Sequence, residues 1–148
     1  MNLTPNFTLE ELIKSDTARR RGLVNIPTDE QAAELLRLAV TVLQPIRDLI
    51  KEPMQINSGF RSKALNYAVG GTHQSQHLDG QAADFVTPTM DLNIIYDAIK
   101  ASDIPFDQLI WEWKGWGNQW IHVSCHRIGE EPRRQALKLH RPHRRFGG

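Results

Sequence analysis

Hydrophobic residues in the first third of the chain follow a helical period, and the segments with this pattern begin with capping signals. At each start a Thr is followed three positions later by Glu or Gln, which forms a capping box for the first backbone N–H groups of a helix. The capping pairs are Thr8 with Glu11 and Thr28 with Gln31. After the second pair, hydrophobic positions recur from 32 to 49 with the roughly 3.6-residue period that predicts a helix of about 20 residues. Pro45 lies inside this segment and should kink the helix, because proline has no backbone N–H to donate.

The rest of the chain contains short runs in which polar and hydrophobic residues alternate, a pattern that predicts strands. These runs are 54–58, 82–86, 106–111 and 120–124, and a glycine-containing loop at 114–118 joins the last two. Helical patterns at 61–68, ending before Gly70-Gly71, and at 91–101 separate the runs. Helices come first and antiparallel strands later, which predicts the α+β class, a small antiparallel sheet with flanking helices.

Length and composition indicate a soluble globular protein with one main domain. The chain has 148 residues, of which 40% are hydrophobic and 24% are charged, and these fractions are ordinary for a folded domain. The N-terminal residues form neither a secretory signal nor a membrane span, so we expect synthesis in the cytoplasm. We also expect a monomer. The single cysteine, Cys125, excludes an intrachain disulfide and a cysteine-rich zinc site, and we interpret it as a small buried residue.

Charge is distributed unevenly along the chain, although the net charge is only +1. From residue 132 onward there are cations and no carboxylate: Arg133, Arg134, Lys138, Arg141, Arg144 and Arg145. We therefore expect a domain over residues 1–131 and a basic C-terminal tail over residues 132–148. The tail is either a solvated terminus or a segment that binds an anionic polymer of the cell envelope. No nucleic-acid partner is expected, because the acidic remainder of the chain has no basic stripe with stacking aromatic residues.

Two histidines and an aspartate stand where they are candidates for a metal site. His77 precedes Asp84 by seven residues, and Gly80 between them permits a backbone turn into the predicted strand 82–86. His122 lies in the strand 120–124, where its neighbours point to the opposite face, so its ring faces the polar side of the sheet. A catalytic zinc ion needs three such nitrogen or oxygen ligands and leaves its fourth position to water. Taken one at a time, these residues are more often hydrogen-bonded histidines or a capping aspartate.

Two longer motifs make the site more specific. Residues 75–84 have the pattern S-x-H-x-x-G-x-A-x-D, and residues 120–123 read WIHV. Together they closely resemble the family of zinc D-Ala-D-Ala carboxypeptidases and L-alanyl-D-glutamate endopeptidases, which shares its fold with hedgehog signalling domains and includes many phage endolysins. The likeness covers about residues 7–124, including SGFRS at 58–62 and the N-x-x-x-G-G pattern at 66–71.

The resemblance implies both a metal site and a reaction. It implies a Zn²⁺ ion held by His77, Asp84 and His122, with Arg61 as the cation that grips a carboxylate or carbonyl of the substrate. The implied reaction is hydrolysis of a peptide bond in the stem peptides of bacterial peptidoglycan, of the D-Ala-D-Ala carboxypeptidase or L-Ala-D-Glu endopeptidase type. An endolysin that acts on the cell wall after release from a phage-infected host needs no signal peptide. The alternative is a zinc-containing module that binds wall peptides without cutting them.

The general base of the family is replaced in this chain. Many members place Glu three residues before the last histidine, and here that position is Gln119, which cannot accept a proton. Glu112 ends the preceding strand and, with an even pairing register, would share a face with His122. We therefore assign the role of general base to Glu112. The rivals for this role are His73 and His126.

Tryptophans cluster around the predicted hairpin, at Trp111, Trp113, Trp116 and Trp120. Those that alternate into the core are expected to pack there. We place Trp113 and Trp116 in the loop, where they are candidates to line a substrate groove, and core packing or anchoring of the loop is the alternative role for each.

Overall fold

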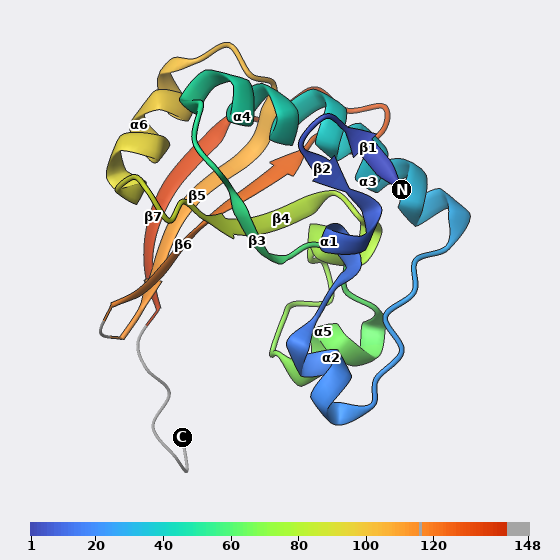
Figure 1. The fold of residues 1–148 in the computed structure, drawn as a ribbon. Coiled ribbons are helices and arrows are strands. Elements are labelled where there is room, and N and C mark those ends of the chain that lie inside the picture. Colours follow the sequence, from blue (N-terminus) through green and yellow to red (C-terminus); the bar gives the residue numbers. More distant parts are fainter. Residues whose placement is uncertain (116, 142–148) are drawn as a thin grey trace.

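The computed structural model describes residues 1–115 and 117–141, and within them the chain forms a five-stranded sheet (Figure 1). Its strands are β3 (Gln55–Ser58), β4 (Ala82–Val86), β5 (Phe106–Lys114), β6 (Asn118–Cys125) and β7 (Gln135–Arg141). They lie in the order β3-β4-β6-β5-β7 and pair antiparallel, except that β7 runs parallel to β5. A short antiparallel pair, β1 (Asn2–Thr4) and β2 (Phe7–Thr8), forms a separate sheet. The α+β class is confirmed, and the parallel edge strand is a departure from the predicted antiparallel sheet.

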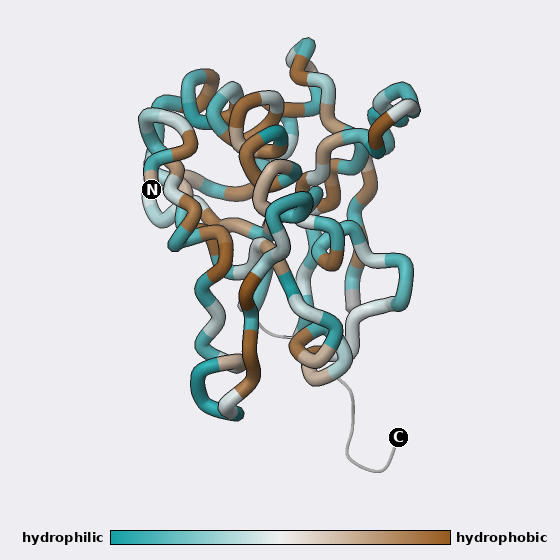
Figure 2. The backbone as a smooth tube through the Cα atoms, turned by 90° about the vertical axis from the view of Figure 1, so that its right-hand side faces the viewer, coloured by the Kyte–Doolittle hydropathy of each residue, from teal (hydrophilic) through white to brown (hydrophobic). Residues whose placement is uncertain are grey.

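Helices α3 (Asp29–Leu38), α4 (Gln44–Ile50) and α6 (Leu92–Ala101) cover one face of the sheet (Figure 1). Their buried residues form the core with the inward-facing side chains of β4, β5 and β6, namely Ala83, Phe85, Leu109, Ile121 and Val123. Figure 2 shows hydrophobic and hydrophilic residues interspersed along the chain, as expected where each element has one buried side. The outward-facing residues of the same strands, Asp84 and His122 among them, lie on the opposite face.

The predicted helix starts are confirmed, and the long helix has an interruption of its own. Thr8 with Glu11 caps α1 (Leu9–Ile13), and Thr28 with Gln31 caps α3, in each case through reciprocal hydrogen bonds. Between α3 and α4 lies a π-helical turn, η1 (Ala39–Leu43), which ends two residues before Pro45, the position at which the sequence predicts a kink. The short elements that complete the described chain are α2 (Asp16–Arg21), α5 (Lys63–Ala68) and the 3₁₀ turn η2 (Gln76–Asp79). No helix in the described residues is long and apolar enough to cross a membrane.

The predicted basic tail begins inside the folded domain. Strand β7 pairs with β5 along its whole length, from Gln135 beside Gln108 to Arg141 beside Lys114. The sheet therefore extends past the predicted domain boundary at residue 131. Apolar and polar residues alternate in Leu137-Lys138-Leu139-His140, which suits an edge strand, but the cations of the segment dominate the sequence pattern. Residues 142–148, with Arg144 and Arg145, lie outside the described residues, as does the side chain of Arg141.

Cations of this segment make contacts within the fold. Arg133 donates hydrogen bonds from Nε and Nη2 to the two carboxylate oxygens of buried Asp107, at 3.0 and 2.7 Å. The guanidinium of Arg134 lies 4.4 Å from the centre of the Phe106 ring, and the ammonium of Lys138 lies over aromatic rings of α6 and β5. The cations at these three positions, which suggested an anionic partner, thus attach β7 to the domain.

Candidate metal centre

His77 lies in η2, the 3₁₀ turn that leads into β4. Ser75 begins this turn by accepting a hydrogen bond from the backbone N–H of His77 at 3.2 Å, and Gly80 ends it with a φ of +74°. A Cβ atom at Gly80 would come within 2.5 Å of the backbone oxygen of Gln31, so glycine serves both the turn and the contact with α3. This local structure holds His77 against the sheet, where it is buried.

A backbone carbonyl orients the ring of His77. Its Nδ1 lies 2.7 Å from the oxygen of Gly59, and because a carbonyl oxygen only accepts, Nδ1 carries the proton. The lone pair is then on Nε2, which faces Oδ1 of Asp84 at 3.3 Å. Since the ring is fixed from its far side, Nε2 is presented in one orientation, as in histidines that bind metals.

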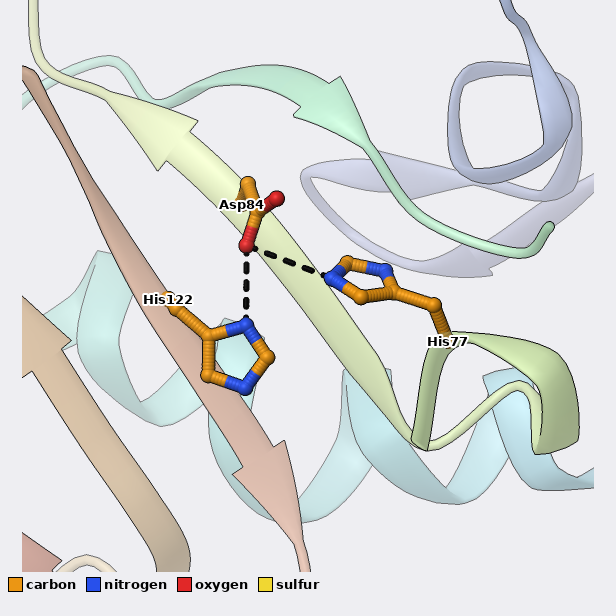
Figure 3. Close-up of side chains that lie close together, drawn as sticks. All are labelled: His77, Asp84 and His122. Carbon is orange, nitrogen blue, oxygen red and sulfur yellow. Dashed lines mark hydrogen bonds and ion pairs between the residues drawn. The ribbon is translucent and has the colours of Figure 1, made fainter. Parts of the chain in front are cut away.

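Strand register brings Asp84 and His122 together. The two residues are directly opposite in the antiparallel pair of β4 and β6, and Nδ1 of His122 lies 2.9 Å from Oδ1 of Asp84. Figure 3 shows this carboxylate oxygen facing both His122 and His77. The rings of the two histidines meet edge to face, with centroids 5.2 Å apart, and the possible ligand atoms of the three residues lie within 4.8 Å of one another. The three residues predicted as ligands are thus brought together.

The charge states of this cluster suit a bound cation. Burial lowers the pKa of His77, which keeps its ring neutral at neutral pH despite the adjacent carboxylate. Burial alone would raise the pKa of Asp84, but the adjacent imidazoles of His77 and His122, together with the hydrogen bond between His122 and Asp84, hold that pKa well below its ordinary value, so the carboxylate is ionised. Two imidazole nitrogens and one carboxylate oxygen are a donor set that zinc accepts, and catalytic zinc sites have three protein ligands. These residues therefore fit a zinc ion.

Arg61 lies beside the cluster and is held by the motif that follows it. Its Nη2 is 3.4 Å from Oδ2 of Asp84, and its Nη1 donates to Oδ1 of Asn66 at 3.2 Å. Asn66 also donates to the backbone of the loop after α5, and a Cβ atom at Gly71 would lie 2.0 Å from Oδ1 of Asn66. The N-x-x-x-G-G pattern thus fixes the guanidinium and the loop together. The sequence contains this pattern but does not by itself indicate a role for Asn66.

The cluster opens into a groove of about 1480 Å³, and Glu112 lines the same groove. In the register of β5 and β6, Ile110 lies opposite His122 and Glu112 lies opposite Trp120. Glu112 therefore shares a face with His122, one side-chain position further along the sheet, as the even register requires. Its side chain is buried, with the residue 5% exposed.

Gln119 lies on the opposite face of the sheet. It pairs with Trp113, and its Oε1 accepts a hydrogen bond from Nε1 of Trp111 at 2.9 Å. A residue three positions before His122 in a regular strand points away from it, because side chains alternate between faces. In this strand a glutamate at position 119 would also point away from the cluster.

The two histidines that are rivals for the role of general base lie in different places from Glu112. His73 is exposed and lines the groove, whereas His126 follows β6, and its backbone carbonyl accepts a hydrogen bond from Arg37 of α3. Among the tryptophans of the hairpin, Trp113 is placed differently from the prediction. It belongs to β5 and not to the loop, and it stacks on His140 with ring centroids 5.6 Å apart. Among the tryptophans of the described residues, Trp120 lines the groove, whereas the sequence pattern pointed to the loop tryptophans. Trp116 lies outside the described residues.

Comparison with known proteins matches this geometry to a family. A family-level sequence description, Peptidase M15, matches residues 5–124. The chain belongs to the Peptidase M15 family. The matched residues of this family member contain the three clustered residues, Arg61 and Glu112, while β7 lies beyond them.

A curated relative is similar over part of the chain. It is the zinc D-Ala-D-Ala carboxypeptidase of Streptomyces albus G, which is 35% identical over 80 residues. The similar region covers 53% of this Peptidase M15 chain and 30% of the length of the relative. The likeness to this relative is therefore confined to a part of each protein.

Proposed function

We propose that this chain is a zinc-dependent peptidase that hydrolyses a peptide bond in bacterial peptidoglycan. The observation that carries the proposal is the convergence of two imidazole nitrogens and a carboxylate oxygen within 4.8 Å of one another, in an open groove. Membership of the Peptidase M15 family supports the reaction, and the name of the Streptomyces relative supports zinc and a D-Ala-D-Ala substrate. His77, Asp84 and His122 are then the ligands of the zinc ion.

In this proposal the residues of the chain orient the reactants and move protons. Zinc, when bound, supplies a Lewis acid that polarises the substrate carbonyl and acidifies water. The Gly59 carbonyl keeps the proton of His77 on Nδ1, so that Nε2 stays available as a ligand. Glu112, on the same face as His122, accepts a proton from the attacking water and passes it to the leaving amine. Arg61, beside Asp84, holds a carboxylate or carbonyl of the substrate with its planar donor fork.

The finer assignment is an endolysin-like peptidase that acts on the cell wall after release from a phage-infected host. It follows from the sequence resemblance, in particular from the motifs at 58–84 and 120–123. The alternative, a module that binds wall peptides without cutting them, was motivated by Gln119. Gln119 points away from the cluster and Glu112 lines the groove, which supports hydrolysis over binding alone.

Mass spectrometry of purified muropeptides tests the proposal. Incubation with the zinc-loaded protein should shorten them, with loss of a terminal D-Ala indicating a carboxypeptidase and an internal cut indicating an endopeptidase. A chelator should stop the reaction, and added zinc should restore it. Unchanged muropeptides after incubation with folded, zinc-loaded protein would contradict the peptidase function. Cleavage that continues in chelator would contradict the role of the metal.

A further inference from the structure

Strand β7 extends the groove beyond the residues that the family match covers. On the groove side, Leu139 of β7 stands directly beside Glu112 of β5, which in turn lies opposite Trp120 of β6. Neighbouring strands are about 4.8 Å apart, so Leu139 and Trp120 lie on either side of Glu112 and roughly 10 Å from each other. A strand outside the matched region thus contributes a wall next to the candidate general base.

Leu139 is exposed although it is large and aliphatic. It keeps 36% of its surface accessible, whereas Ala136 of the same strand packs against the core on the other face. The start of β7 is anchored by the hydrogen bonds of Arg133 to Asp107. The attachment of β7 therefore does not depend on Leu139, and its side chain is available to a molecule bound in the groove.

We propose that Leu139 is a specificity-determining residue: with Trp120 it forms an apolar subsite that receives an aliphatic side chain of the peptide substrate. This inference rests on the proposed peptidase function. Leu139 lies roughly 12 Å from His122 by strand geometry, so the side chain it contacts belongs to a residue about three or four positions at most from the bond that is cut. Lys114 lines the groove towards the hairpin end, and Glu130 and Arg133 line it towards the other end. These polar borders suit a peptide whose aliphatic residue is flanked by polar groups.

The test measures kcat/KM on synthetic stem peptides in which each residue near the cut is Ala, Leu or Glu in turn. Wild type should prefer Leu over Glu at one position. Leu139→Ala should weaken that preference about tenfold, since contacts with a few methylene groups have this effect, and it should leave the zinc content unchanged. Leu139→Phe, which fills the subsite, should shift the preference towards Ala. Lys138→Ala is the matched control, because Lys138 is the adjacent residue and faces the aromatic rings on the other side of the sheet.

Equal preferences in wild type, both Leu139 variants and the Lys138 control would overturn the inference. If folded, zinc-loaded wild type cuts none of the peptides, the proposed peptidase function fails. The apolar subsite is then tested separately, by peptide binding. In that case the unmodified stem pentapeptide should shift the NMR signals of the Leu139 methyl groups and the Trp120 indole in wild type. Absence of both shifts at millimolar peptide would reject the subsite.

Discussion

The orientation of His77 depends on a close approach between two backbone segments. A Cβ atom at Gly59 would lie 2.2 Å from the backbone oxygen of Leu12, so only glycine lets this segment pass the end of α1. Phe60 then donates its N–H to the same oxygen at 2.8 Å, which fixes the Gly59 carbonyl that faces His77. The orientation of Nε2 of His77 therefore depends on Gly59 as well as on the candidate metal ligands themselves.

A prediction for a single residue concerns Glu112, the candidate general base. Glu112→Gln should retain zinc and lose about 10²–10⁴-fold in turnover of muropeptides, because the amide keeps the shape of the side chain and cannot accept a proton. Turnover by mass spectrometry and zinc by elemental analysis are measured on the same preparation.

Gln119→Glu serves as the matched control, since position 119 points to the opposite face of the sheet. It should neither add activity to wild type nor rescue Glu112→Gln. A near-wild-type rate for Glu112→Gln would transfer the role of base to His73, which lines the groove.

Among the elements, the sheet decides which side chains meet. Asp84 lies opposite His122 across β4 and β6, and Ile110 lies opposite His122 across β5 and β6. A slip of one residue in either pairing would turn a whole set of side chains to the other face. The buried residues on the helix side, such as Phe85 and Ile121, oppose such a slip because they would leave the core.

The link between β5 and β7 gives a prediction on stability. Burial alone would raise the pKa of Asp107, but hydrogen bonds and attraction from Arg133 lower it below its ordinary value. Arg133→Gln should reduce the free energy of unfolding at pH 7 by about 1.5 kcal/mol, near the low end for a hydrogen bond to a charged group. We take the low end because the Arg133 side chain is 53% exposed, so solvent weakens the interaction.

This stabilisation should depend on pH in a defined direction. Because the folded pKa of Asp107 is depressed, the contribution is complete above the unfolded pKa of about 3.9 and is lost as pH falls through the folded pKa. The difference between wild type and Arg133→Gln in chemical denaturation should therefore shrink below about pH 3.5. Lys114→Gln, which changes an exposed cation of β5, the strand that contains Asp107, controls for the loss of charge. A difference that stays constant from pH 7 to pH 3 would show that Arg133 acts by packing alone.

For the whole molecule, zinc should act as a stabilising ligand of the folded state. The candidate ligands come from η2, β4 and β6, so an ion that they hold joins segments distant in sequence. Zinc at about a hundred times its dissociation constant should add about 2.7 kcal/mol to the free energy of unfolding, or roughly 5–10 °C to the melting temperature. Elemental analysis should find one zinc ion per chain.

Single variants separate the ligands from the other histidines. His77→Ala, Asp84→Ala and His122→Ala should each abolish the thermal shift, because removing one of three protein ligands leaves an incomplete site. His73→Ala, an exposed histidine of the same groove, should keep both zinc and the shift. Stoichiometric zinc in the triple variant of the candidate ligands would show that the metal is bound elsewhere.

The sequence by itself determined the local structure and the identity of the clustered residues. The capping boxes at Thr8 and Thr28 could be predicted because their hydrogen bonds close within one helical turn. The alternation around His122 showed which of its neighbours point to the core, since side chains in a strand change face at each residue. The motif around His77 and Asp84 supplied the remaining members of the cluster.

Only the tertiary structure decided which other side chains share the groove. The sequence predicts that Glu112 shares a face with His122 only if the register is even, and it does not show that Trp120 lines the groove while Trp113 does not, because sharing a face depends on the register between strands and on where the hairpin turns. The pairing of β7 with β5 could not be predicted from the sequence, since the paired segments are about 27 residues apart, and the cations of β7 suggested a solvated tail. Contacts that close within a few residues are encoded locally, whereas a groove is made by strands that meet only when the whole sheet has formed.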